Sequence, residues 1–117
     1  SIPLTVNEWD EWGDPADAED FEAMLAYSPY DNLPRGPRPA LLVTGTLHDP
    51  RVLVHEPAKW VARLRATDDL ARPSLLLFRA ELGEGAHTGP SGRFAHLAYE
   101  AEVLAWILDR LCVVTLP

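Results

Sequence analysis

Basic residues are scarce in this chain, where ten Lys and Arg stand against eighteen Asp and Glu and the formal net charge is −8. A surface of this sign repels the phosphate backbones of DNA and RNA, which argues against nucleic acid as a partner. The charge favours cationic ligands, although an acidic, solvated surface accounts for most of these carboxylates without any ligand.

Cysteine and long apolar runs are equally rare. Cys112 is the single cysteine, so the chain has no internal disulfide, which fits a reducing compartment and predicts a cytoplasmic protein. We expect its thiol to be buried at the end of a helix. No apolar run approaches the roughly 20 residues of a membrane span, and no signal peptide opens the chain at Ser1, so no membrane partner is expected.

Two short apolar runs stand out among the residues that are present. Residues 40–45 and 74–78 are apolar on both faces, as central strands of a parallel sheet are. An amphipathic helix pattern lies between them, with Pro57 in its first turn and Trp60, Val61 and Leu64 on its inner face. This strand–helix–strand order predicts two parallel strands with their carboxyl ends at one edge.

The remaining segments have weaker signals. Residues 1–14 have no helical period and are predicted to form an extended loop, and Asp14-Pro15 is expected to start a helix that ends at Ser28-Pro29. The expected buried face of that helix consists of Ala18, Phe21, Met24 and Leu25. A longer helix is expected over 92–111, with a buried stripe of Phe94, Leu97, Ala98, Ala101, Leu104, Ala105, Leu108 and Leu111.

Two doubly buried strands do not make a stable sheet by themselves, because both of its edges would be unpaired. We therefore predict an α/β fold in which residues 1–117 are one segment of a larger parallel sheet. Further strands would lie beside the 40–45 strand in the intact protein.

One acid and one imidazole follow the two predicted strands. Asp49 comes just after the first strand, and His87 lies in a glycine-rich loop after the second. Because the carboxyl ends of parallel strands share an edge, these two side chains are expected to meet, as the Asp and His of a Ser-Asp-His triad do. A G-x-S-x-G nucleophile elbow is absent from the 117 residues.

The other histidines have simpler explanations. His48 is adjacent to Asp49 in the sequence and is expected to point away from it, and His55 and His96 lie in or beside helices, where surface or packing roles are common. No set of His, Cys and carboxylates has the spacing of a metal site, so no metal is predicted.

Two carboxylates near the start of the chain form a third candidate. Glu8 and Asp10 would share one face of an extended segment, and together they match a guanidinium or ammonium group. A solvated acidic loop is the simpler explanation, although the neighbouring Trp9 and Trp12 indicate that this loop packs against something.

Several stretches together resemble the oligopeptidase B branch of the prolyl oligopeptidase family of serine peptidases. They are Ser1–Thr5, Asn7–Pro15, Tyr27–Asn32, Leu41–Thr44, Leu47–Asp49, Glu56–Ala62 and Ser91–Phe94. The resemblance runs from Ser1 to about Leu111. It implies the C-terminal part of an α/β-hydrolase catalytic domain, with the serine elbow and a propeller domain upstream.

The resemblance also implies roles. Asp49 and His87 match the triad acid and base, and Glu8 matches the acid that receives a basic P1 side chain, with Asp10 beside it. Substrates would be short peptides with Arg or Lys at P1, no cofactor would be needed, and the isolated 117 residues would be inactive.

Three departures from the family pattern affect the loops. The usual Gly-His-Gly-Gly is replaced by a sequence with Ala86 and Thr88 around the histidine, about three extra residues lie near Arg72, and Asp10 replaces the commoner glutamate. Two alternatives stay open: a non-enzymatic interaction module derived from a hydrolase, and an aminopeptidase or esterase of the same superfamily.

Overall fold

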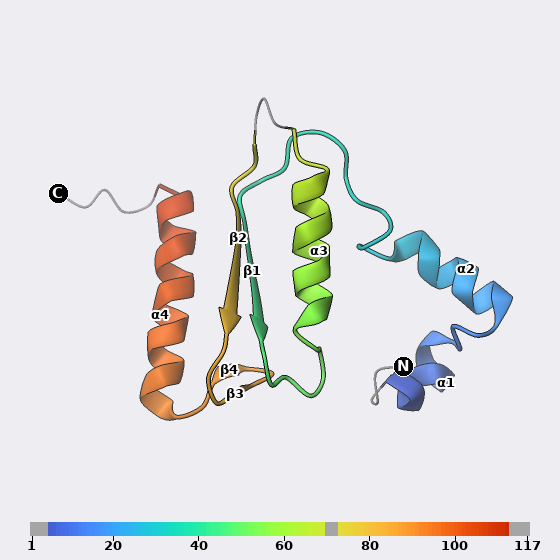
Figure 1. The fold of residues 1–117 in the computed structure, drawn as a ribbon, viewed down its shortest axis with the longest axis horizontal. Coiled ribbons are helices and arrows are strands. Elements are labelled where there is room, and N and C mark those ends of the chain that lie inside the picture. The colour runs from blue at the N-terminus through green and yellow to red at the C-terminus, as the bar shows by residue number, and fades with distance from the viewer. Residues whose placement is uncertain (1–4, 70–72, 113–117) are drawn as a thin grey trace.

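The computed structural model describes residues 5–69 and 73–112 (Figure 1). In chain order the elements are the 3₁₀ helix η1 (Thr5–Glu8), the helices α1 (Trp9–Trp12) and α2 (Ala18–Tyr27), the strand β1 (Leu41–Thr46), the helix α3 (His55–Ala66), the strands β2 (Leu76–Glu81), β3 (Gly85–Ala86) and β4 (Gly89–Pro90), and the helix α4 (Arg93–Arg110). Within the described ranges, no helix is both long enough and apolar enough to span a bilayer.

The predicted strand–helix–strand unit is confirmed. β1 and β2 pair in parallel, with Leu41 opposite Leu76 and Thr46 opposite Glu81, and α3 connects them. β2 begins later than predicted because the backbone N–H of Ser74 donates to a side-chain oxygen of Asp68 at 2.8 Å and so belongs to the connection. Both strands end at the lower edge in Figure 1, where β3 and β4 lie beneath them.

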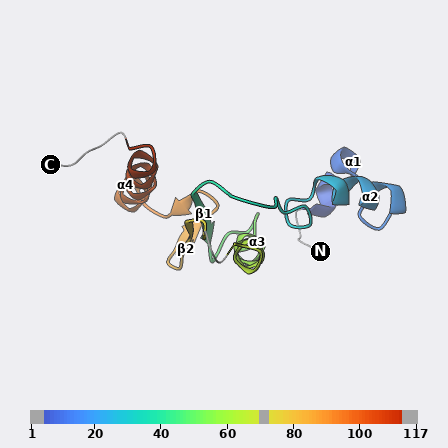
Figure 2. The ribbon, with the colours of Figure 1, turned by 90° about the horizontal axis from the view of Figure 1, so that it is seen from above.

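α3 and α4 cover opposite faces of the strand pair (Figure 2). On the α3 side, Val61 and Leu64 are buried, as predicted, whereas Trp60, predicted on the same face, is only partly buried and turns its indole N–H to Pro29. Gly45 allows the first turn of α3 to approach β1 closely, because a Cβ atom on it would lie 3.1 Å from Cγ of Pro57 and 3.4 Å from the ring of Phe78. This close approach fixes the start of α3 near the carboxyl edge of the sheet.

α4 packs on the sheet with a different face from the predicted one. Val103 and Trp106 line cavities together with Leu42 of β1. The predicted stripe is exposed instead, from 82 % at Phe94 to 39 % at Leu108. Both sides of α4 are apolar, so periodicity alone could not identify which one contacts the strands.

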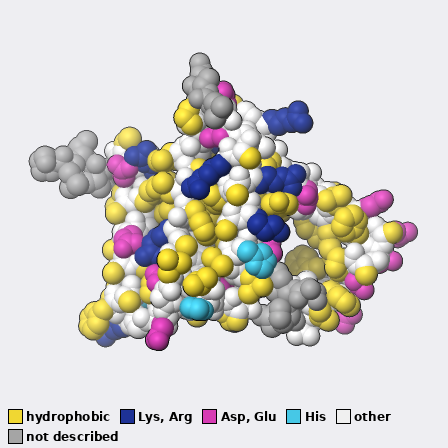
Figure 3. Space-filling view, in the orientation of Figure 1, with side chains coloured by type: hydrophobic (Ala, Val, Ile, Leu, Met, Phe, Trp, Pro, Cys, Tyr) yellow, Lys and Arg dark blue, Asp and Glu magenta, His cyan; other side chains and the backbone are white. Residues whose placement is uncertain are grey.

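The hydrophobic core formed by the described residues is small. Val61 and Leu64 are the hydrophobic side chains that are fully buried within these ranges. The Cα radius of gyration is 17.2 Å, against about 13 Å for a compact domain of this length. Figure 3 shows hydrophobic side chains in the open across the middle of the molecule. The strand pair is therefore covered only in part by its own helices.

Residues 5–12 do not form the extended loop that was predicted for 1–14. Over residues 5–12 the chain is helical in η1 and α1, and the N–H of Gly13 donates to the carbonyl of Trp9 at 2.9 Å, which closes a helical turn. Residues 1–4 lie outside the described ranges.

The next helix also starts later than predicted. Asp17, not Asp14, caps α2, because its Oδ1 accepts the N–H groups of Glu19 at 2.9 Å and Asp20 at 3.2 Å. Asp14 instead accepts from Ala16 in a tight turn. The apolar side chains of α2 that were expected to be buried are largely uncovered, with Phe21 half exposed and Leu25 41 % exposed.

Residues 5–34, here called the acidic arm, are attached to α3 through Pro29, Tyr30 and Asp31. The indole N–H of Trp60 donates to the carbonyl of Pro29 at 2.9 Å, and Arg63 pairs with Asp31 at 3.3 Å. The guanidinium of Arg63 also lies 4.4 Å from the ring centre of Tyr30. These contacts determine where the arm lies relative to the strands.

A partly buried ion pair joins the segments at the opposite edge of the sheet. Nη2 of Arg38 lies 2.6 Å from Oδ1 of Asp68 and also donates to the carbonyl of Leu64 at 2.9 Å. The Arg38 hydrogen bond, together with the N–H of Ser74, lowers the pKa of the Asp68 carboxyl. Cys112, predicted to be buried, is exposed just after α4 because no described segment covers that end of the helix.

Candidate active site at the carboxyl edge of the sheet

Asp49 is held rigidly in the turn after β1. Its Oδ1 accepts the backbone N–H groups of Arg51 at 2.8 Å and Val52 at 3.1 Å, and its own N–H donates to the carbonyl of Thr46 at 3.2 Å. The side chain is only 7 % exposed. These bonds occupy Oδ1 and leave Oδ2 to face the loop that follows β2.

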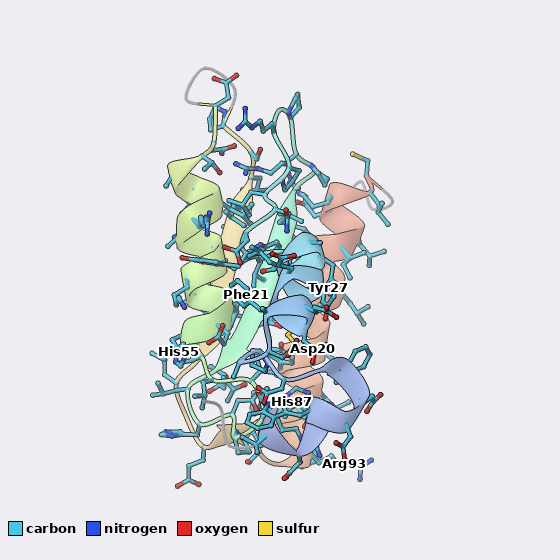
Figure 4. All side chains as sticks on the ribbon, turned by 90° about the vertical axis from the view of Figure 1, so that its right-hand side faces the viewer. Asp20, Phe21, Tyr27, His55, His87 and Arg93 are labelled. Carbon is cyan, nitrogen blue, oxygen red and sulfur yellow. The ribbon has the colours of Figure 1, made fainter. Side chains whose placement is uncertain are left out.

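His87 meets that free oxygen. It lies in the turn of the β3–β4 hairpin, and its Nδ1 is 2.9 Å from Oδ2 of Asp49. The ring is 46 % exposed, and among residues 5–69 and 73–112 no hydrogen bond occupies its Nε2. In Figure 4 His87 lies level with α1, at the carboxyl edge of the strands. An imidazole held at Nδ1 by a carboxylate and open at Nε2 is arranged as a general base.

The local electrostatics keep Asp49 ionised. Burial raises the pKa of its carboxyl, but hydrogen bonds from the N–H groups of Arg51 and Val52 and the contact with His87 outweigh this, and the pKa lies below its usual value. A carboxylate stabilised in this way can hold the Nδ1–H tautomer of His87 and stabilise the imidazolium.

The Cβ atoms around the histidine are accommodated without strain. Ala86 and Thr88 flank the histidine, and among the described non-glycine residues only Cys112 has a positive φ. The positive φ of the hairpin falls on Gly89, at 103°. The turn therefore keeps its glycine where the backbone requires one.

Two neighbouring cavities surround the pair. One of about 200 Å³ is lined by both Asp49 and His87, with Val52 and Tyr99 among the other residues. The second, of about 410 Å³, is lined by Thr5, Asn7, Glu8, Arg51 and Val52. Val52 borders both, so the structure brings Glu8 to the loop that holds Asp49.

Asp10 does not join Glu8 in this cavity. Residues two positions apart on a helix point about 200° apart, and the chain is helical here. The predicted shared face of Glu8 and Asp10 is therefore wrong. Both carboxylates are exposed, but Asp10, on α1, does not line the cavity.

The larger cavity of about 520 Å³ lies elsewhere, between β1 and α4. Its lining is mainly apolar and contains no acid–base pair, since its one carboxylate, Glu100, pairs with His96 at 3.1 Å. Of the other histidines, His55 pairs with Glu56 at 2.9 Å and His48 is exposed. Within the part of the chain that is described, no group of His, Cys, Asp and Glu is placed to hold a metal ion.

The charge of the chain is unevenly distributed, which its total does not reveal. The first 34 residues contain nine carboxylates and no Lys, Arg or His. The residues after them are close to neutral. The negative charge is therefore concentrated in the segment that contains Glu8, whereas Arg51 contributes a cation to the wall of the same cavity.

Comparisons with known proteins give consistent matches. The profile of the prolyl oligopeptidase family matches residues 1–112. Protease 2 from Moraxella lacunata is 52 % identical over 115 residues, which are 97 % of this chain and 16 % of that protein. Dipeptidyl aminopeptidase BI from Pseudoxanthomonas mexicana is 45 % identical over 113 residues, again 97 % of this chain and 15 % of that protein.

Solved structures agree in fold. Oligopeptidase B from Leishmania major superimposes with a TM-score of 0.86 at 36 % identity, over 94 % of this chain and 15 % of that one. Oligopeptidase B from Trypanosoma brucei, in a closed form with covalently bound antipain, gives 0.88 at 39 %, over 98 % of this chain and 16 % of that one. The chain thus spans about one sixth of the length of these proteins.

Proposed function

The chain belongs to the prolyl oligopeptidase family and corresponds to part of its α/β-hydrolase catalytic domain, and on this basis we propose that it supplies the acid and the base of a serine peptidase. The observation that carries the proposal is the 2.9 Å contact between Nδ1 of His87 and Oδ2 of Asp49. The serine would come from another part of the parent protein, since the 117 residues contain no nucleophile elbow.

The proposed mechanism follows from the geometry of this pair. Nε2 of His87 accepts the proton of the serine hydroxyl as the oxygen attacks the scissile carbonyl. His87 then donates the proton to the leaving amine, and the acyl-enzyme is hydrolysed by water through the same steps. Asp49 remains ionised throughout, because the N–H groups of the following turn hold its charge.

We propose that the substrates are short peptides with Arg or Lys at P1, and that Glu8 receives the basic side chain. This proposal is supported by the position of Glu8 in a cavity beside the Asp49 turn. Glu8 also belongs to a segment that contains nine carboxylates and no basic residue. Asp10 would contribute to the negative potential rather than to direct contact with the P1 group.

A second candidate function is aminopeptidase activity. Its support is the 45 % identity to a relative named dipeptidyl aminopeptidase. Arg-naphthylamide substrates with blocked and free amines separate the two: an endopeptidase cleaves the blocked form, whereas preference for the free amine would identify an aminopeptidase. The formed contact between Asp49 and His87 supports either enzyme over a non-enzymatic interaction module.

We further propose that residues 1–117 are the C-terminal part of the catalytic domain, and that the parent supplies the strands beside β1 and a propeller domain. The small core and the uncovered apolar surfaces support this. The isolated piece is expected to be inactive and to lack a cooperative unfolding transition as a monomer. A cytoplasmic location is part of the proposal and rests on the single cysteine.

Labelling with an active-site-directed phosphonate tests the proposed function. The intact parent is expected to bind one equivalent, and the Asp49→Asn and His87→Ala variants are expected to react far more slowly. The isolated 117 residues should not be labelled. Stoichiometric labelling of the isolated piece would show that the nucleophile lies within it and would refute the proposal.

A further inference from the structure

We infer that Tyr99 of α4 is a positioning residue that holds the β3–β4 hairpin, and with it His87, against Asp49. The inference rests on the proposed function, because it gives Tyr99 a part in placing the same base. Tyr99 itself is not a catalytic residue, since its ring supports the backbone of the hairpin rather than the reacting atoms.

The two members of the acid–base pair are anchored very differently. Asp49 is held by two backbone N–H groups of its own turn. His87 lies on a hairpin with only two residue pairs, Gly85 with Pro90 and Ala86 with Gly89. A hairpin of this size is not stable by itself in water. The position of the imidazole therefore depends on the groups that pack against the hairpin.

Side chains from β1, β2 and α4 support the hairpin at its glycines, and Cγ of Glu81 on β2 would lie 3.1 Å from a Cβ atom on Gly85. A Cβ atom on Gly85 would lie 2.9 Å from Cγ2 of Thr46, at the end of β1. A Cβ atom on Gly89 would lie 3.2 Å from Cε1 of Tyr99 and 3.3 Å from Cδ1. Gly89 is buried, and Tyr99 also lines the cavity that contains Asp49 and His87. The ring of Tyr99 is thus in direct contact with the backbone two residues after the base.

The ring of Tyr99 is itself held in place. The guanidinium of Arg79 on β2 lies 4.4 Å from the ring centre, in cation–π geometry. Arg79 is fixed in turn by Glu102 at 2.6 Å and Glu81 at 3.4 Å. The ring of Tyr99 therefore lies between Arg79 of β2 and Gly89 of β4, and a shift of the ring would displace the hairpin.

Kinetics of the intact parent protein test this inference. Tyr99→Leu, which removes the planar ring, is expected to lower kcat by about 30- to 100-fold, as displacements of a catalytic group of about 1 Å do. KM is expected to change by less than about threefold, since the Glu8 cavity is untouched. The pH profile of kcat/KM should also change shape. Tyr99→Phe keeps the ring and should restore kcat to within about twofold of the parent.

Trp106→Leu is the matched control. Trp106 lies two turns further along the same face of α4, does not line the cavity of Asp49 and His87, and has an indole N–H with no hydrogen-bond partner among the described residues. This variant should lose stability but keep the kcat and pH profile of the parent. A kcat for Tyr99→Leu within about threefold of the Trp106→Leu value would overturn the inference.

A second variant covers the case in which Tyr99→Leu does not fold. Arg79→Met removes the cation–π contact with the ring of Tyr99 but keeps the tyrosine itself. This variant is expected to lower kcat at least about threefold at unchanged KM. An unchanged kcat in that variant would overturn the inference. If Asp49→Asn and His87→Ala abolish activity while the Tyr99→Leu and Arg79→Met variants keep the kcat of the parent, only the role of Tyr99 fails. If the Asp49 and His87 variants are fully active, the proposed function fails.

Discussion

Asp49→Asn tests the proposed mechanism most directly, because the structure determines how the asparagine must orient. Oδ1 of Asp49 accepts two backbone N–H groups, so the amide oxygen of the asparagine must take that place. The reverse orientation would set an NH₂ group against two donors and would cost about 2 kcal/mol or more in lost hydrogen bonds. The NH₂ group therefore falls at the place of Oδ2, 2.9 Å from Nδ1 of His87.

This orientation forces the wrong tautomer on the imidazole. Facing a donor, Nδ1 of His87 must accept, so the proton resides on Nε2, which then cannot take the proton of the serine. A loss of this kind lowers kcat about 10⁴-fold, or about 5.5 kcal/mol in activation free energy. KM is expected to be unchanged, because the substitution leaves the Glu8 cavity intact.

The assay is steady-state hydrolysis of a blocked Arg-amide substrate by the intact parent, together with thermal unfolding of the same preparation. Asp31→Asn is the matched control: it is the same substitution at an aspartate of the acidic arm that pairs with Arg63, and it should keep kcat. If Asp49→Asn folds normally and retains kcat within about tenfold of the parent, the tautomer argument is wrong.

Three other predictions follow from the same contacts. Glu8→Gln should raise the activation free energy that corresponds to kcat/KM by at least about 2 kcal/mol for Arg substrates, because it leaves the desolvated cation of the substrate unpaired. Substrates with a neutral P1 residue should be unaffected, and equal effects on both substrates would show that Glu8 is not part of the P1 site. Trp60→Phe should lower the free energy of unfolding by about 1 kcal/mol and speed hydrogen exchange in residues 28–32, since the bond to Pro29 is lost; unchanged exchange there would contradict the attachment of the arm. The lowered pKa of Asp68 means that its ion pair with Arg38 stabilises the fold above pH 3.8 and that this stabilisation is lost as pH falls through the folded-state pKa. Asp68→Asn should therefore be most destabilising at pH 7 and progressively less so as the pH falls below 3.8, and a destabilisation that does not vary with pH would rule out this linkage.

The residue pattern predicted the structure correctly where only one local conformation fitted it. The two apolar runs are predicted to be buried strands, and a helix between them brings both carboxyl ends to one edge of the sheet. The structure confirms the parallel pairing and places Asp49 next to His87. Pattern failed where two local solutions were equally good. Asp14 and Asp17 are both good helix caps, and the choice between them depended on which one found free N–H groups.

Tertiary contacts decided the rest. The predicted apolar stripe of α4 follows the helical periodicity, but it is exposed, and a second apolar face that includes Val103 and Trp106 is turned toward the strands. No sequence signal pointed to Tyr99, because an aromatic residue on an apolar helix is indistinguishable from ordinary packing until its neighbour is known to be Gly89.

The sequence by itself determined the strand–helix–strand unit, the parallel pair and the two residues that meet at its carboxyl edge, because hydrophobic period and chain connectivity act within a short span of chain. Only the tertiary structure decided how firmly each member of the pair is held, which helix face covers the sheet, and that Glu8 lies beside the Asp49 turn while Asp10 does not. These features depend on contacts between residues far apart in the chain, and such contacts exist only after the elements have packed.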